Sequence, residues 1–475
     1  MSRSPLLAQA QGVAGGGGQG RGGAQPPGRI GSIDERTSGM QKIDGYFPLY
    51  WDERSGSLFL EIPRFDSEFL FTTGLAAGLG SNDIGLDRGQ GGQGRVVEFR
   101  RMGPKVLLVQ GNESFRSTSP NPAERKSVAD SFASSVLWGF PVAAESGGHV
   151  LVDASDFLLR DVHGAGGALR PGTYRVDRTR SAFYLPRTKG FPKNTEVEMV
   201  LTFASEGAGG RGGGGGPVQG PPPIAQAPAG GRGAGGGRGG GLFSGSVASV
   251  APSADAVTLR EHVSFVELPD DHYTPRWDDP RAGYGGLTFV DYSVPIGEPM
   301  QMHYIRRHRL EKKDPAAAMS EPVKPIQYWV DSGAPEDVKK ALLEGASWWN
   351  QAFEAAGFRN AFKVDVLPDG ADPMDIRYNM INWVHRSTRG WSSGGSVADP
   401  RTGEIIKATV TLGSLRDRQD YMIFEGLLSP YTTGSEKPPI LYQTALKRIR
   451  QLAAHEVGHT LGLGHTTTAT RAGSR

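Results

Sequence analysis

Residues 455–465 read His455-Glu456-Val457-Gly458-His459-Thr460-Leu461-Gly462-Leu463-Gly464-His465. Side chains four positions apart lie on one face of a helix, so His455 and His459 can present two imidazoles to one ion. Gly462 tolerates the left-handed backbone that ends a helix, which allows the chain to reverse and return His465 to the same ion. Three imidazoles leave one position of a tetrahedral site open, as in catalytic zinc sites. The segment therefore predicts a Zn2+ site with His455, His459 and His465 as ligands.

Glu456 follows the first of these histidines and projects about 100° away from it around the helix. In that direction its carboxylate is better placed to contact a water molecule bound to the ion than to contact the ion itself. We expect Glu456 to act as general base, while the ion lowers the pKa of the water and polarises a carbonyl group. Iron, cobalt or manganese can also occupy an all-imidazole site, so zinc is the predicted metal on chemical grounds but ligand type alone does not select it.

The alternative is that His455 and His459 are ordinary surface or core histidines. That interpretation leaves the spacing of Gly462 and His465 unexplained. The segment before the motif, residues 442–454, has no proline or glycine that would break a helix. The other histidines lack metal-ligand spacing and are expected to be ordinary polar residues; they include His262, His272, His303, His308 and His385.

Composition excludes several classes of function. The 52 basic and 50 acidic side chains give a net charge of +2, so no strong field attracts nucleic acid or an anionic membrane. The Arg-Gly clusters lack the interleaved aromatic residues that stack on bases. No run of about 18 apolar residues is present to span a membrane. Cysteine is absent, so a metal must be held by imidazole or carboxylate.

The 475 residues are enough for two or three domains, and their pattern changes along the chain. Residues 1–40 and the insertion 207–255 are Gly-rich and are expected to be disordered. The rest of residues 41–320 carries many short β-branched or aromatic runs without alternating helices, which predicts an antiparallel β-rich domain of sandwich or barrel-like form. The predicted strands include residues 58–62, 69–72, 96–99, 106–109, 196–201 and 263–266.

Residues 321–475 show a different order, which predicts a second, α/β domain. Apolar spacing from Pro335 to Gly357 predicts a long helix with proline in its first turn and glycine at its C-cap. Alternation around Asp399-Pro400-Arg401-Thr402-Gly403 predicts a hairpin. In sequence order we expect a strand at 325–331, the helix at 335–357, strands at 362–367 and 376–384, the hairpin at 394–412 and a helix at 441–461.

The eleven positions of the histidine motif resemble the signature of the metzincin clan of zinc metalloproteases. The elements of residues 325–412 look like the upper half of a metzincin catalytic domain, in which an edge strand aligns the peptide substrate. Four further segments resemble a family of large bacterial zinc-dependent metalloproteases with uncharacterised N-terminal regions: residues 45–52, 306–315, 345–358 and 385–391. This resemblance implies metal ligation by His455, His459 and His465, catalysis by Glu456 and a peptide or protein substrate.

The sequence departs from the metzincin pattern after the third histidine. Metzincins continue into a methionine-containing turn and a closing helix, whereas here no methionine follows Met422 and residues 466–475 are polar. We therefore expect a C-terminally truncated chain with an incomplete catalytic domain. The function expected from the resemblance is that of a zinc-dependent metalloendopeptidase. The alternatives are a zinc-binding but inactive remnant and an extracellular β-rich binding or scaffold protein.

The N-terminal Arg3, the Leu6-Leu7 pair and Ala8-Gln9-Ala10 look like an incomplete export signal, but the apolar part is shorter than the roughly 7–15 residues such a signal needs, so a disordered tail is an equal alternative. We expect a secreted bacterial protein, periplasmic or extracellular.

Overall fold

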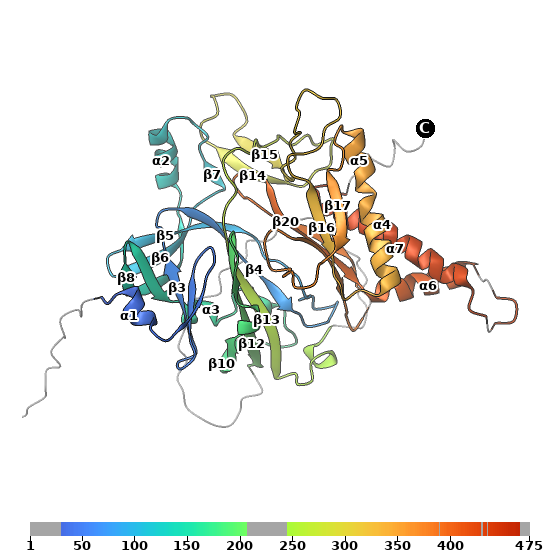
Figure 1. Ribbon diagram of the computed structural model, residues 1–475, viewed down its shortest axis with the longest axis horizontal. Helices are drawn as coiled ribbons and strands as arrows, with labels where there is room; N and C mark the ends of the chain where they lie inside the picture. The colour runs from blue at the N-terminus through green and yellow to red at the C-terminus, as the bar shows by residue number, and fades with distance from the viewer. Residues whose placement is uncertain (1–29, 207–244, 389, 429–430, 435, 466–475) are drawn as a thin grey trace, which may run out of the picture.

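The computed structural model describes residues 30–206, 245–388, 390–428, 431–434 and 436–465. It is a mixed α+β structure in which strands dominate the N-terminal part and the longest helices lie in the C-terminal part (Figure 1). The predicted α+β class and strand-rich N-terminal region are therefore confirmed. Within the described residues, no helix is long and apolar enough to cross a membrane.

The N-terminal strands form one antiparallel sheet in the order β1-β2-β3-β9-β8-β6-β5-β4-β13-β12-β10, with β11 paired to β12. Its strands are β1 (Gln41–Ile43), β2 (Leu49–Asp52), β3 (Ser57–Ile62), β4 (Glu68–Ala77), β5 (Arg95–Met102), β6 (Lys105–Gln110), β8 (Ser135–Ser146), β9 (His149–Asp153), β10 (Tyr174–Phe183), β11 (Lys189–Gly190), β12 (Asn194–Ser205) and β13 (Ala256–Val266). All six predicted strands lie within this sheet.

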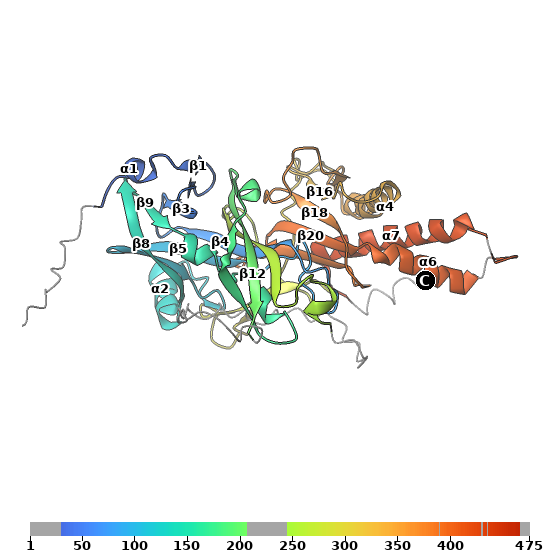
Figure 2. The ribbon, with the colours of Figure 1, turned by 90° about the horizontal axis from the view of Figure 1, so that it is seen from below.

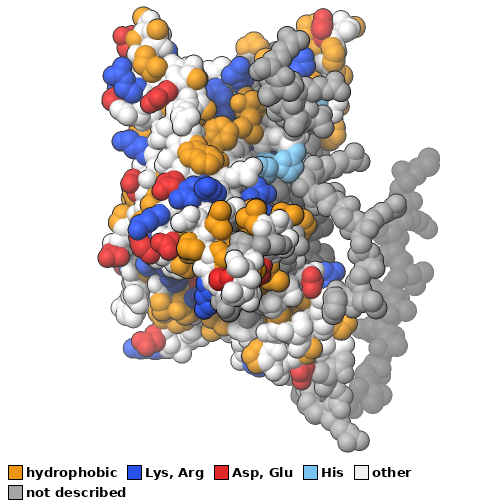
Figure 3. Space-filling model, turned by 90° about the vertical axis from the view of Figure 1, so that its right-hand side faces the viewer, with side chains coloured by type: hydrophobic (Ala, Val, Ile, Leu, Met, Phe, Trp, Pro, Cys, Tyr) orange, Lys and Arg blue, Asp and Glu red, His pale blue; other side chains and the backbone are white. Residues whose placement is uncertain are grey.

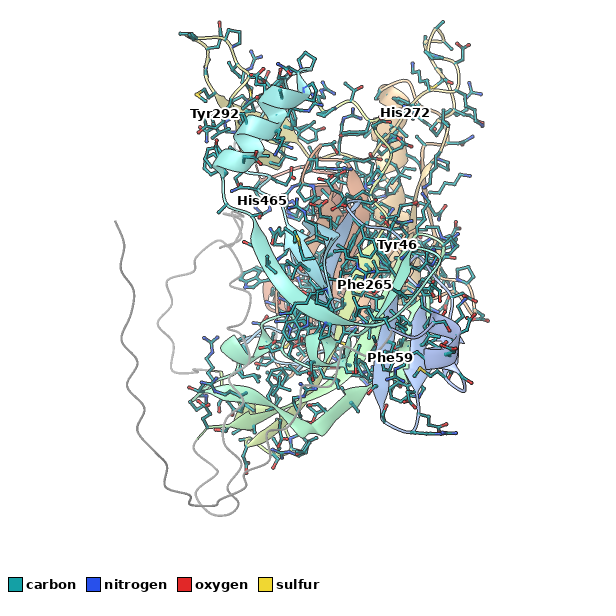
Figure 4. All side chains as sticks on the ribbon, turned by 90° about the vertical axis from the view of Figure 1, so that its left-hand side faces the viewer. Tyr46, Phe59, Phe265, His272, Tyr292 and His465 are labelled. Atoms are coloured by element: carbon teal, nitrogen blue, oxygen red, sulfur yellow. The ribbon has the colours of Figure 1, made fainter. Side chains whose placement is uncertain are left out.

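The sheet curls until its two ends approach each other. Trp51 of β2 and Phe183 of β10 come from opposite ends of the strand order, yet their ring centroids are 5.9 Å apart. The curled sheet encloses an apolar core in which Phe47 packs edge-to-face on Phe69 and Phe99. Figure 4 shows Phe265 of the same core within this sheet. Burial of these rings supplies much of the driving force for folding this region.

Two parts of the predicted disordered tracts are ordered instead. Helix α1 (Ile33–Thr37) lies within residues 1–40, where a capping box between Ser32 and Glu35 and burial of Ile33 hold it in place. A 3₁₀ turn, η3 (Val247–Ser249), lies within residues 207–255, with Val247 fully buried. The prediction of disorder rested on the Gly-rich composition of each tract as a whole. It was wrong for these two short segments because a few of their side chains are capped or buried. The remaining parts, 1–29 and 207–244, and the C-terminal 466–475 lie outside the described residues.

A second, small sheet links the two parts of the chain. It has the order β15-β14-β7 and consists of β7 (Phe115–Arg116), β14 (Gly286–Asp291) and β15 (Gln301–Ile305). The chain after it already contacts the C-terminal part before residue 320, because Arg307 pairs with Glu404 in an isolated bridge. Ser320 itself is hydrogen-bonded to Gly357 and Arg359. Backbone hydrogen bonds therefore connect the segments on either side of residue 320. The domain boundary at this residue stays a prediction.

The C-terminal sheet has the order β17-β16-β18-β20-β19. Its strands are β16 (Ile326–Val330), β17 (Phe362–Val366), β18 (Asn379–Val384), β19 (Ser393–Ala398) and β20 (Ile405–Gly413). The first four in this spatial order pair in parallel, and β19 runs antiparallel to β20 at the edge. The predicted strands and hairpin are present, and the hairpin leaves β19 as an edge strand.

Four helices accompany this sheet: α4 (Glu336–Ser347), α5 (Trp349–Ala355), α6 (Leu415–Leu428) and α7 (Pro439–Thr460). The single helix predicted for residues 335–357 is divided at Trp348, and Gly357 after it has a positive φ of 86°. Helix α6 was not predicted because its apolar residues do not form a buried stripe; Met422 and Leu427 are exposed. Figure 2 shows α6 and α7 side by side, extending away from the large sheet.

Candidate metal centre

Helix α7 and the turn after it bring three imidazoles together. The Nε2 atom of His455 lies 3.2 Å from that of His459 and 3.1 Å from that of His465. The Nε2 atoms of His459 and His465 are also 3.1 Å apart. Among the described residues, this is the one group of three or more His, Cys, Asp or Glu whose ligand atoms all lie within 4.8 Å of one another. The structure thus assembles the three histidines that the spacing singled out.

This triangle of nitrogens fits a zinc ion. With zinc–nitrogen bonds of about 2.0–2.1 Å, ligands at tetrahedral angles are roughly 3.3 Å apart, close to the observed separations. Hydrogen bonding alone does not account for the arrangement, because each neutral imidazole nitrogen either donates or accepts. Three Nε2 atoms at 3.1–3.2 Å from one another match the spacing that ligation of a single ion requires. Figure 3 shows histidine side chains reaching the surface on one face, and both His455 and His465 are exposed.

Gly462 produces the reversal that returns His465 to α7. Its φ is +103°, in the left-handed region predicted for it. A Cβ atom at this position would lie 2.0 Å from the carbonyl oxygen of Arg306, so glycine is required by space as well as by conformation. The amide of Leu463 then donates to the carbonyl of Gly458 at 3.1 Å, which closes the end of the helix.

The same turn orients one of the three imidazoles. The Nδ1 atom of His459 lies 2.8 Å from the carbonyl oxygen of Leu463, so Nδ1–H donates and the lone pair of Nε2 faces the other histidines. Burial, with the proximity of His459 and His465, lowers the pKa of His455 and favours its neutral, metal-binding form. The Leu463 carbonyl had not been singled out in the sequence, because a backbone acceptor has no signature beyond the glycine that shapes the turn.

Glu456 lies on α7 beside the histidines and is 5% exposed. Burial raises the pKa of its carboxyl to about 6, an effect that nearby His459 partly opposes. A carboxylate with this pKa is still mainly ionised at pH 7, and it holds a proton more readily than an exposed glutamate does. These are the properties of an effective general base near neutral pH.

Close backbone contacts fix α7 against α4 and α5. A Cβ atom on Gly345 would lie 2.1 Å from the carbonyl oxygen of Arg450, and one on Gly458 would lie 2.8 Å from the ring of Trp349. The indole Nε1 of Trp349 donates to the carbonyl of Ala454 at 2.9 Å. The sequence did not show that Trp349 supports the helix that carries His455 and His459.

A buried hydroxyl network supports the end of α7 from the other direction. Tyr328 of β16 is fully buried, and its hydroxyl lies 2.7 Å from Oγ1 of Thr460, which itself donates to the carbonyl of Val457 at 2.7 Å. The Nε2 atom of His308 lies 3.4 Å from the Tyr328 hydroxyl, and burial lowers the pKa of His308 to about 4. His308 is therefore a partly buried, neutral residue next to the site, whereas it was expected only to be an ordinary polar residue.

The edge strand β19 lies directly against α7, the helix that carries His455 and His459. A Cβ atom on Gly394 would be 2.1 Å from the carbonyl oxygen of Glu456 and 3.0 Å from Cβ of His459. This close approach requires glycine, and it places an open β-sheet edge beside the histidines. Other histidines lie elsewhere: Nδ1 of His262 is 3.2 Å from Glu196 in the large sheet, and Figure 4 shows His272 well separated from His465.

The packing of β19 predicts a difference between two neighbouring glycines. Gly394→Ala forces β19 away from α7, and we expect a loss of roughly 1–3 kcal/mol in the free energy of unfolding, as for other overpacked sites. Gly395→Ala is the control, because no atom lies within 4 Å of a Cβ there. Chemical denaturation of both variants measures the difference, and equal stabilities would show that β19 does not pack on α7 as described.

Two family models match this chain. One, described as a domain of unknown function (DUF5117), matches residues 89–313. The other, described as Met-zincin, matches residues 437–475 and so includes α7 and all three histidines. No curated protein and no solved structure matches. The match supports a metzincin-like C-terminal region, and together with the histidine cluster it suggests zinc binding and a metallopeptidase class of function.

Proposed function

We propose that this protein is a zinc-dependent metalloendopeptidase that hydrolyses peptide bonds. The observation that carries the proposal is the meeting of three Nε2 atoms at 3.1–3.2 Å next to a buried glutamate on the same helix. His455, His459 and His465 would hold the ion. We further propose that the chain is related to the large bacterial zinc-dependent metalloproteases that its sequence resembles. We also propose that it is exported from the cytoplasm.

The chain's own groups have distinct tasks in this reaction. Zinc, when bound, acts as a Lewis acid that lowers the pKa of water and polarises the scissile carbonyl. Glu456 accepts the proton of the attacking water and passes it to the leaving amine, a cycle that suits a carboxyl whose pKa burial has raised to about 6. The Leu463 carbonyl keeps His459 in the tautomer that offers Nε2.

The edge strand supplies a way to hold a peptide. Among the residues that the structure describes, β20 is the one strand paired with β19, and Gly394 and Gly395 of β19 carry no side chains that would block an approaching backbone. An extended peptide can add to such an edge through main-chain hydrogen bonds. Binding of this kind depends little on the peptide's sequence, so we expect broad specificity.

An unstructured protein such as casein tests the proposal. The zinc-loaded chain is expected to cleave it, to lose this activity on chelation and to regain it when zinc is restored. Stoichiometric zinc without cleavage would reject the peptidase and leave a zinc-binding protein. Partner binding retained by residues 41–320 alone, with no zinc bound by the full chain, would favour the binding or scaffold alternative.

A further inference from the structure

A short segment of the N-terminal region, the strap (residues 283–286), is hydrogen-bonded to the turn that carries the third histidine. Tyr284 of the strap and Leu463 of the turn form an isolated antiparallel bridge. The amide of Gly285 donates to the carbonyl of Gly462 at 2.7 Å, and the amide of Gly464 donates to the carbonyl of Gly283 at 2.7 Å. The strap thus bonds the turn on both sides of Leu463.

The strap is itself anchored to the body of the protein. The amide of Arg306 donates to the carbonyl of Gly285 at 2.9 Å, and Gly286 pairs with Ile305 in the β14–β15 ladder. A Cβ atom on Gly286 would lie 2.4 Å from the carbonyl oxygen of Tyr304, so a residue with a side chain does not fit there. The turn is therefore held between the end of α7 and a braced pair of strands.

The contacts leave little freedom to the residues between the second and third histidines. Leu463 uses its amide to close α7 and its carbonyl to orient His459. The strap is hydrogen-bonded to Gly462 and Gly464, the two glycines on either side of Leu463. Gly464 immediately precedes His465, so the bond from Gly464 to the strap fixes the point from which the imidazole of His465 reaches the other two.

We propose that the strap is a positioning element of the metal centre, so that the N-terminal region completes the site whose ligands the C-terminal region carries. The inference rests on the proposed zinc site. The strap lies within residues 89–313 and the turn within 437–475, the two segments that match different family models. One role of the region of unknown function is then to preorganise the third ligand.

The expected effect is on metal affinity. Groups that orient metal ligands typically contribute about 10–100-fold to affinity, and a loose turn would leave His465 sampling many positions away from the other two imidazoles. Without the strap, the protein should hold zinc through His455 and His459 with His465 only intermittently in place. The strap therefore acts through His465 and takes no part in the chemistry.

Two substitutions at one position test the inference in the full chain. Gly285→Pro removes the amide that donates to Gly462. Gly285→Ala keeps this amide, and its Cβ meets only the Gly462 carbonyl oxygen, at 3.6 Å. Zinc affinity from a competition titration with a chelating dye is expected to fall about 10–100-fold for Gly285→Pro and to stay within about twofold for Gly285→Ala. Equal affinities for the proline variant and the parent would overturn the inference.

A measurement on the unmodified chain covers the case in which the proline variant fails to fold. Hydrogen exchange of the metal-free protein should show the amides of Gly285 and Gly464 protected, because each is bonded across the strap and the turn. Rapid exchange of both amides would overturn the strap. If the parent chain binds no zinc at all, the proposed function fails, while the protection of these two amides still reports on the strap.

Discussion

Glu456→Gln is expected to leave the zinc content unchanged and to abolish peptide cleavage. Glutamine has nearly the same shape and no basic carboxylate, so it preserves the packing of α7 but cannot accept a proton from water. Loss of a positioned general base costs about 10²–10⁴-fold in rate. The effect should fall on kcat, because Glu456 takes no part in holding an extended peptide on β19.

Glu354→Gln is the matched control for this experiment. Glu354 lies in α5 and is exposed, so the same chemical change there should alter neither zinc content nor cleavage. Metal analysis and initial rates on casein measure both variants. Full turnover by the Glu456→Gln chain would remove Glu456 from the mechanism, and loss of its zinc would instead assign this residue to the support of the metal site.

His459→Ala is expected to remove most of the bound zinc. It deletes one of three ligands and also the Nδ1–H that donates to Leu463, so the turn that carries His465 loses an internal contact. We expect the loss in affinity to exceed the roughly 10–100-fold typical of an orienting group. Zinc measured after dialysis against a weak chelator reports the change.

His272→Ala provides the comparison for that loss. The side chain of His272 is 83% exposed and lies well away from His465 in Figure 4, so its removal should leave zinc content and folding unchanged. Circular dichroism should show that both variants keep the parent's secondary structure, because neither histidine belongs to an apolar core. Retention of stoichiometric zinc by His459→Ala would contradict the assignment of His459 as a ligand.

Local features of the site were predictable because each depends on few residues. The helix predicted for residues 441–461 is α7 (Pro439–Thr460), and the left-handed Gly462 follows from its spacing between two histidines. The hairpin around residues 399–403 was found because strand alternation and turn residues coincide there. In these cases, nearest neighbours in the sequence determine the structure.

Features that depend on contacts between distant segments were not predictable. A sandwich or barrel-like form was expected for the large sheet, but no local pattern encodes the contact between β2 and β10 at which its ends meet. The strap and the partly buried His308 lie far from α7 in sequence. The glycines of the strap look like ordinary turn residues, and His308 looks like an ordinary polar residue. Helix α6 lacked a clear apolar period, so periodicity could not identify it.

Ion pairs join the N-terminal region to the C-terminal region. The side chain of Arg386, in the loop after β18, is 4% exposed and donates two hydrogen bonds of 2.8 Å to the carboxylate of Asp87 in the N-terminal region. Arg309 pairs with Glu404 at 2.8 Å near the turn of the hairpin. Separation of the two regions would break these partly buried ion pairs together with the hydrogen bonds of the strap. We therefore expect the two regions to unfold together.

X-ray absorption at the zinc edge tests the central assignment most directly. The zinc-loaded chain should give three imidazole nitrogens and one further light atom at about 2.0–2.1 Å. In the chain with alanine at positions 455, 459 and 465, bound zinc and this signal should both be lost. A zinc spectrum with fewer than three imidazoles, or stoichiometric zinc in the triple-alanine chain, would contradict the account.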